Sequence, residues 1–155
     1  QRGSSVRLER DDLVLARGLE RAAPLPEAPV CLASPGSVRL GDTVVAVGTE
    51  LPSGMTGLAV TASAVAGGVR VRRRRPGDRF RPLGLRGTKK LQDFFVDAHV
   101  PRDERDSIPI FETERGIVCV GRLRIADWAR PREGEPTVLL GYATTNGGAA
   151  KAPAT

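Results

Sequence analysis

The chain has 155 residues, of which 40% are hydrophobic and 27% are charged, and its formal net charge is +6. These values are those of a soluble globular protein that can bury a core, and the excess of positive charge favours an acidic partner such as nucleic acid, an anionic membrane or an acidic protein surface. No apolar run approaches the roughly 20 residues of a membrane-spanning helix, and the polar start of the chain shows no secretory leader, so we expect a cytoplasmic protein without a membrane partner.

The first 68 residues predict β-structure and no helix. Residues 22–29 are rich in proline and are expected to form an extended connector. Alternating or β-branched residues predict strands in the rest of this part. These elements are a hairpin over residues 4–17, strands around a Gly-Asp turn over residues 37–48, a loop over residues 51–57 and a strand over residues 58–68.

A run of basic residues follows over residues 69–90, with the sequence VRVRRRRPGDRFRPLGLRGTKK, in which Asp78 is the only acid. Residues 69–74 alternate, so their valines are expected on one face of a strand and their arginines, Arg72 among them, on the other. Pro76-Gly77 is expected to end this strand in a tight turn. Asp78 is expected to be a turn residue that pairs with an arginine.

Residues 88–98 predict the clearest helix of the chain. One apolar stripe occupies positions i, i+3, i+4 and i+7, and it consists of Leu91, Phe94, Phe95 and Ala98. Thr88 is expected to cap the start of this helix, and Pro101 to end it and to open a second helical turn over residues 101–106. Further strands are expected over residues 108–113, 116–125 and 137–143, followed by a disordered tail over residues 144–155. The sequence therefore predicts a β-dominated α+β fold whose main helix packs against a sheet.

Lys89 and Lys90 fall in the first turn of the predicted helix, where the macrodipole favours acids. An anion bound by the backbone N–H groups and both ammonium groups would remove this conflict, and Arg79, Arg81 and Arg86 lead into the same place. We therefore favour an anion site over a solvated basic face that has no ligand. So wide a basic surface suits the backbone of a polyanion, and the aromatic content of 4% favours duplex or folded RNA over a stacked single strand.

The sequence gives little support for catalysis or metal binding. His99 has no nucleophile near it in sequence and is expected to be a surface or capping residue. Asp93 and Asp97 share one face of the predicted helix, and salt bridges to arginines are favoured over a metal because no third ligand is evident. Cys31 and Cys119 are isolated and cannot supply the roughly four ligands of structural zinc, so both are expected to be packed and reduced. No catalytic or metal-ligating residue is therefore assigned.

Two stretches carry a resemblance to a known family: RRRRPGDRFRPLGLRGTKKLQDFFVDAHVPRDERDSIPIF and, after it, GIVCVGRLRI. Within them RPGDRFRPLG is followed by G-[ST]-KKL, a DFF-like helix, a proline-led turn with an arginine, and IP before a strand. Over residues 69–126 this order resembles the C-terminal domain of bacterial tRNA(Ile)-lysidine synthase. The resemblance implies a tRNA-binding domain over residues 69–143, preceded by a β-rich segment over residues 1–68. It also implies a β-sandwich-like fold similar to a domain of phenylalanyl-tRNA synthetase β chains.

By this resemblance, the parent enzyme uses ATP with Mg to ligate lysine to the wobble cytidine of tRNA(Ile) bearing a CAU anticodon. Its ATP chemistry belongs to an N-terminal domain with an SGGxDS loop, which does not occur here, so this chain is expected to be inactive alone and to need no cofactor of its own. The part present would grip the body and acceptor stem of tRNA(Ile) and meet the enzyme's own N-terminal catalytic domain. The residues implied in tRNA contact are Arg73, Arg75, Arg79, Arg81, Arg86, Lys89 and Lys90. The alternative is a docking or regulatory domain whose basic face binds an acidic protein surface.

Overall fold

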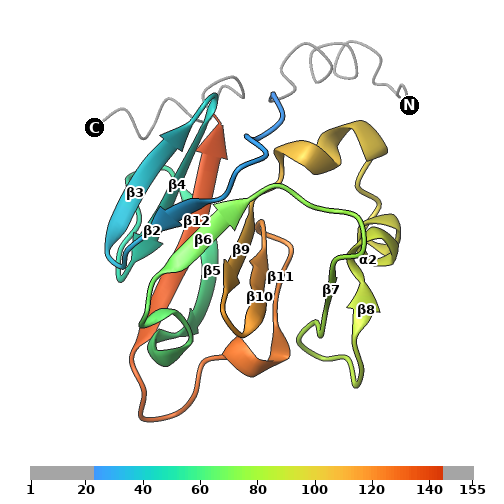
Figure 1. The fold of residues 1–155 in the computed structure, drawn as a ribbon. Coiled ribbons are helices and arrows are strands. Elements are labelled where there is room, and N and C mark those ends of the chain that lie inside the picture. The colour runs from blue at the N-terminus through green and yellow to red at the C-terminus, as the bar shows by residue number, and fades with distance from the viewer. Residues whose placement is uncertain (1–22, 145–155) are drawn as a thin grey trace.

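Two antiparallel sheets form a sandwich in the computed structural model, which describes residues 23–144 (Figure 1). Sheet 1 contains, in spatial order, β11 (Arg124–Ile125), β10 (Gly116–Val120), β9 (Ile110–Thr113), β6 (Val69–Arg72) and β2 (Val30–Leu32). Sheet 2 contains β3 (Gly36–Leu40), β4 (Thr43–Gly48), β12 (Thr137–Thr144) and β5 (Thr56–Thr61). The chain passes between the sheets three times, so residues on both sides of position 68 build each layer.

A two-stranded ribbon and one α-helix lie to the side of sheet 1 (Figure 1). The ribbon pairs β7 (Arg79–Phe80) with β8 (Lys89–Lys90), and β8 leads directly into α2 (Leu91–Asp97). Short 3-10 helices connect other elements: η1 (Ala62–Val65), η2 (Arg102–Ser107) and η3 (Asp127–Ala129).

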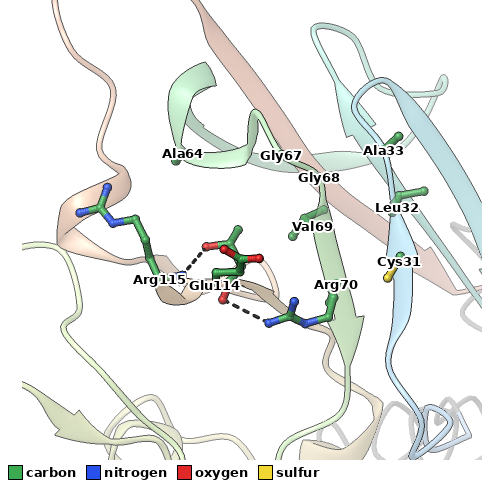
Figure 2. Close-up of a pocket in the computed structure, with 11 residues that line it drawn as sticks. Cys31, Leu32, Ala33, Ala64, Gly67, Gly68, Val69, Arg70, Glu114 and Arg115 are labelled. Atoms are coloured by element: carbon green, nitrogen blue, oxygen red, sulfur yellow. Dashed lines mark hydrogen bonds between the residues drawn. The ribbon is translucent and has the colours of Figure 1, made fainter.

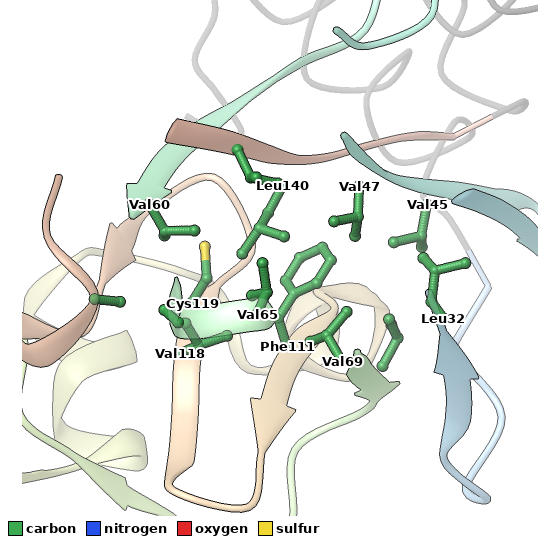
Figure 3. Close-up of a cluster of buried hydrophobic side chains, with 14 of the residues drawn as sticks. Leu32, Val45, Val47, Val60, Val65, Val69, Phe111, Val118, Cys119 and Leu140 are labelled. Atoms are coloured by element: carbon green, nitrogen blue, oxygen red, sulfur yellow. The ribbon is translucent and has the colours of Figure 1, made fainter. Parts of the chain in front are cut away.

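The main core fills the space between the two sheets, as Figure 3 shows. Val45 and Leu140 of sheet 2 meet Phe111 and Val118 of sheet 1, and all four side chains are fully buried. In β10 the pairing register shifts between Ile117 and Cys119. Such a bulge turns two successive side chains towards one face, and Val118 and Cys119 accordingly both belong to the main core.

A second core lies between α2 and the other face of sheet 1. The helix contributes Leu91, Phe94 and Phe95, with exposed fractions of 2%, 6% and 0%, and sheet 1 contributes Ile110 among others. The ring of Phe80 meets Phe94 edge to face, with 5.2 Å between the ring centroids. Because α2 has only seven residues, its stability depends on this packing more than on its own hydrogen bonds.

The structure confirms the β-dominated α+β class and the packing of the main helix against a sheet. It also confirms the hairpin around Gly41-Asp42, the turn after β6 and the short helical element after Pro101. The predicted hairpin over residues 4–17 and all but the first residue of the predicted tail lie outside the described residues. Thr144 itself ends β12.

Three local predictions were wrong. The strand expected over residues 58–68 begins earlier, at Thr56, and gives way after Thr61 to η1, a helical turn that buries Ala64 and Val65. The helix expected over residues 88–98 is shorter at both ends. Cys31 is exposed on the outermost strand of sheet 1, whereas Cys119 is buried as expected. Among the described helices none is long and apolar enough to cross a membrane.

Candidate nucleic-acid interface

Arg72 is a buried arginine that lies beneath the charged surface. Val69 and Val71 of β6 enter the main core, which turns Arg70 and Arg72 to the opposite face of sheet 1. The Arg72 guanidinium donates to both carboxylate oxygens of Glu112 at 3.1 and 3.0 Å. Arg72 therefore lies opposite the valines, as predicted, but its side chain is only 3% exposed and does not belong to the open basic surface.

Asp78 is the second carboxylate bound by Arg72, with both oxygens accepting at 3.1 Å. Arg72 also donates to the carbonyl of Arg73 at 3.0 Å, so all five of its N–H groups are used. Oδ2 of Asp78 accepts the backbone N–H of Arg75 at 2.7 Å across the turn. The prediction that Asp78 is a turn residue paired with an arginine is confirmed.

The same turn fixes the start of α2. The backbone carbonyl of Asp78 accepts the N–H of Leu91 at 2.8 Å. Arg72 therefore fixes the turn through the side chain of Asp78, and the turn fixes the start of α2 through the backbone carbonyl of the same residue.

Lys89 and Lys90 precede α2 instead of forming its first turn. They form β8, because Lys89 pairs with Phe80 and Lys90 with Arg79 in an antiparallel ladder. Lys90 occupies the N-cap position without a side-chain hydrogen bond, and Thr88 is not the cap. The first turn carries an acid, Asp93, and neither lysine, so the conflict predicted for two lysines within the first turn is absent.

A different conflict between like charges takes its place. Arg79 and Lys90 are directly opposite each other in the ribbon, and both are exposed. Like charges at such positions destabilise a strand pair. The ribbon tolerates the pair because Phe80 anchors it in the second core.

The seven predicted contact residues, which we call the basic band, divide into two groups. Three have acidic partners: Arg73 pairs with Glu27, Arg81 with Asp127 at 3.8 Å, and Lys89 with Asp97. Within residues 23–144 the side chains of the other four have no acidic partner. These are Arg75, Arg79, Arg86 and Lys90, and all four are exposed. The pairing of Asp97 with a lysine corrects the expectation that it pairs with an arginine.

A cleft of about 410 Å³ is lined in part by residues of the basic band. We call it the turn cleft, because the turn after β6 forms one wall and the start of α2 another. It is lined by Arg73, Arg74, Arg75, Pro76, Gly77, Asp78, Lys90, Leu91, Gln92 and Asp106. The turn cleft therefore brings together two of the unpaired cations, Arg75 and Lys90.

Arg124 extends the charged surface and was not predicted from the sequence. It is exposed on β11, donates to the carbonyl of Leu83 at 3.2 Å and lies 6.0 Å from the ring centroid of Phe94. Since Pro82 bridges to Ala126, this edge of sheet 1 adjoins the loop that carries Arg81 and Arg86. The alternating sequence RLRI over residues 122–125 was the available signal for an arginine on a strand. It does not reveal which loop lies beside that strand.

A second hollow of about 590 Å³ lies at the far end of β6 (Figure 2). Its arginines are already engaged. Arg70 donates to the carbonyl of Thr113 at 3.3 Å, and the Arg115 guanidinium lies 4.2 Å from the ring centroid of Trp128. Glu114 also lines the hollow, so it offers less free positive charge than the turn cleft.

His99 lies at the end of the main helix. This residue is exposed and follows α2 with a φ of 62°, a conformation typical of the position that ends a helix. Across residues 23–144 no group of three or more His, Cys, Asp and Glu side chains is placed to hold a metal ion. Burial raises the pKa of the Cys119 thiol to about 12, which leaves it unreactive near neutral pH.

Glu112 should make the stability of the fold depend on acid pH. The hydrogen bond from Arg72 lowers its pKa, and burial, which acts in the opposite direction, does not cancel this effect. The Glu112 carboxyl then binds a proton more readily in the unfolded state than in the folded state. Its stabilisation of the fold is complete above the pKa of the unfolded state, about 4.3, and is lost as pH falls through the lower pKa of the folded state. Urea unfolding between pH 6 and pH 3 should show this loss, and Glu112→Gln should flatten the curve. An unchanged pH slope in the variant would contradict the assignment.

Three comparisons with known proteins show which family the chain resembles. The family described as "TilS substrate C-terminal domain" matches residues 69–140. A solved structure described as "Crystal structure of TILS C-terminal domain" is similar with a TM-score of 0.59 and 31% identity, over 76% of this chain and 98% of that one.

Two curated relatives named tRNA(Ile)-lysidine synthase also match. The protein of Caldanaerobacter subterraneus subsp. tengcongensis is 48% identical over 76 residues, which are 49% of this chain and 16% of the relative. The protein of Symbiobacterium thermophilum is 38% identical over 113 residues, which are 68% of this chain and 22% of the relative. This chain thus spans about a fifth of the length of these relatives. Fold, motif order and identity agree, and the chain belongs to the family of TilS C-terminal domains.

Proposed function

We propose that this chain is the tRNA-binding part of a tRNA(Ile)-lysidine synthase and that the basic band contacts RNA phosphates. The observation that carries the proposal is that four exposed cations of the basic band lie on neighbouring elements and have no acidic partner in the described chain: Arg75, Arg79, Arg86 and Lys90. Because no carboxylate of the described chain pairs with them, these four side chains remain available for an external anion. The names of the relatives supply the class of that anion.

The shape of the band supports a phosphate backbone as its ligand. The unpaired cations occupy a turn, a two-stranded ribbon and the loop between its strands, so they form an extended surface instead of one closed pocket. Contacts with phosphates position an RNA and dominate its affinity, and folded RNA is recognised largely by its shape. Trp128 and Tyr142 are partly buried and each lies under an arginine, so neither offers an open platform for stacked bases.

By this proposal the chemistry belongs to the whole enzyme. Ligation of lysine to the wobble cytidine of tRNA(Ile), with ATP and Mg, takes place in a catalytic domain that carries an SGGxDS loop, and the part described here grips the tRNA body and acceptor stem. Its partners are then tRNA(Ile) and that catalytic domain, in the cytoplasm. Turnover of ATP and lysine by this chain alone would contradict the division of labour.

Matched neutralisation of charge tests the proposal. The variant Arg75→Gln/Lys90→Gln should weaken the binding of a tRNA(Ile) transcript by about tenfold or more, which corresponds to about 1.4 kcal/mol. The control Arg39→Gln/Arg132→Gln loses the same net charge from exposed positions outside the basic band and should bind within about twofold of the parent chain. Fluorescence anisotropy at fixed salt measures both. Equal losses of tRNA affinity in the two variants would show that only net charge matters. Tight binding of an acidic protein in place of tRNA would favour the docking alternative.

A further inference from the structure

The turn cleft has an excess of positive charge that the protein does not neutralise. Its lining includes four basic residues and two acids. Both acids are already engaged, since Asp78 accepts from Arg72 and Asp106 accepts from Nε of Arg74 at 2.9 Å. Arg75 and Lys90 face the same cleft and have no acidic partner within residues 23–144. The lining therefore carries a formal charge of +2, from four positive and two negative groups.

The positive character of the cleft comes from side chains and not from the end of the helix. The first N–H of α2, on Leu91, is already donated to the carbonyl of Asp78 at 2.8 Å. An anion in the cleft would instead meet the guanidinium of Arg75, the ammonium of Lys90 and the amide of Gln92, which is exposed at the rim. The backbone of the turn that carries Arg75 is held by the buried Arg72–Asp78 pair, so the wall of the cleft is in place before any ligand arrives.

A terminal phosphate fits this charge and shape better than a phosphate inside the RNA chain. A phosphate monoester carries about −1.5 to −2 charges at pH 7, which complements the lining, whereas each internal diester carries one. The carboxylates of Asp78 and Asp106 also line the cleft and would repel the adjacent phosphates of a strand that ran through it. A strand that ends in the cleft avoids this repulsion.

We propose that the turn cleft binds the 5′-terminal phosphate monoester of the RNA. This inference rests on the proposed function, because it assumes that an RNA is the ligand of the basic band. It adds the chemical group that Arg75 and Lys90 recognise, and it gives the bound RNA a defined orientation, with its 5′ end beside the start of α2.

The test compares one RNA in two forms, a tRNA(Ile) transcript with a 5′-monophosphate and the same transcript after phosphatase treatment. The full chain should bind the phosphorylated form about five- to tenfold more tightly. The variant Arg75→Gln/Lys90→Gln should reduce this ratio to about one, while the control Arg39→Gln/Arg132→Gln should retain it. Circular dichroism of each variant verifies that it is folded.

The outcomes separate this inference from the proposed function. Tight and equal binding of both RNA forms by the parent chain would overturn the terminal-phosphate site and leave tRNA binding intact. Failure of both forms to bind would overturn the proposed function and this inference together. A ratio that persists in Arg75→Gln/Lys90→Gln would show that the 5′ phosphate is recognised elsewhere, and would also overturn the inference.

Discussion

Replacement of Arg72 by methionine is expected to lower the free energy of unfolding by about 3–5 kcal/mol. The variant keeps much of the aliphatic volume but leaves Asp78 and Glu112 without their common partner. These carboxylates are only 11% and 18% exposed, so water cannot fully replace the four hydrogen bonds that they accept from the guanidinium. The turn after β6 should loosen as well, since Asp78 holds both the Arg75 N–H and the Leu91 N–H. Urea unfolding followed by circular dichroism measures the change.

Arg74→Met is the matched control. Arg74 lies two residues further along and pairs with Asp106, but the two side chains are 27% and 41% exposed. Partly exposed ion pairs of this kind contribute about 1 kcal/mol or less. Similar losses of unfolding free energy in the two variants would show that the burial of Arg72 does not make its ion pairs more stabilising than an exposed pair. Arg72→Lys should fall between the two, because an ammonium retains the charge but cannot bind two carboxylates with paired N–H groups.

Phe95→Ala is expected to cost about 3–5 kcal/mol, because the ring is fully buried between α2 and sheet 1 and its loss leaves a cavity. The guanidinium of Arg105, which lies 5.8 Å from the ring centroid, loses that contact too. The loss should appear in thermal unfolding and, more locally, as faster amide exchange in α2 and the ribbon.

Val96→Ala provides the control on the same helix. Val96 is the next residue but is 53% exposed, so its truncation should change the free energy of unfolding by no more than about 0.5 kcal/mol. If Phe95→Ala were equally mild, the second core would not be what holds the helix in place. The tRNA affinity of Phe95→Ala should fall along with α2 stability, since the ribbon that carries Arg79 and Lys90 packs on the same core.

The sequence predicts the elements that depend on near neighbours in the chain. Alternation over residues 69–74 correctly separates the valines of β6 from its arginines, and the stripe of Leu91, Phe94 and Phe95 correctly identifies the buried face of α2. The turn at Pro76-Gly77 follows from residue type alone, and Gly77 adopts a φ of 86° there.

The sequence fails where distant partners decide the outcome. Arg72 resembles its neighbours in a basic run, but Glu112, 40 residues away, comes to lie beside it and converts a surface charge into a buried one. Lys89 and Lys90 resemble a helix start, but their pairing with β7 makes them a strand. The lysines do not form the first turn of the helix, but a candidate anion site remains beside them. Its positive charge comes from side chains without acidic partners in the described chain and not from the helix dipole.

The salt dependence of tRNA binding tests the central claim most directly, because neutralisation of phosphates releases counterions in proportion to the number of contacts. With about five phosphates contacted, the logarithm of the association constant plotted against the logarithm of salt concentration should have a slope of roughly −3.5 to −4.5. In Arg75→Gln/Lys90→Gln the slope should become shallower by roughly 1.4–1.8, since two cations that neutralise RNA charge are lost. A flat salt response of the parent chain, or a slope unchanged in this variant, would contradict the account that the basic band binds RNA through its phosphates.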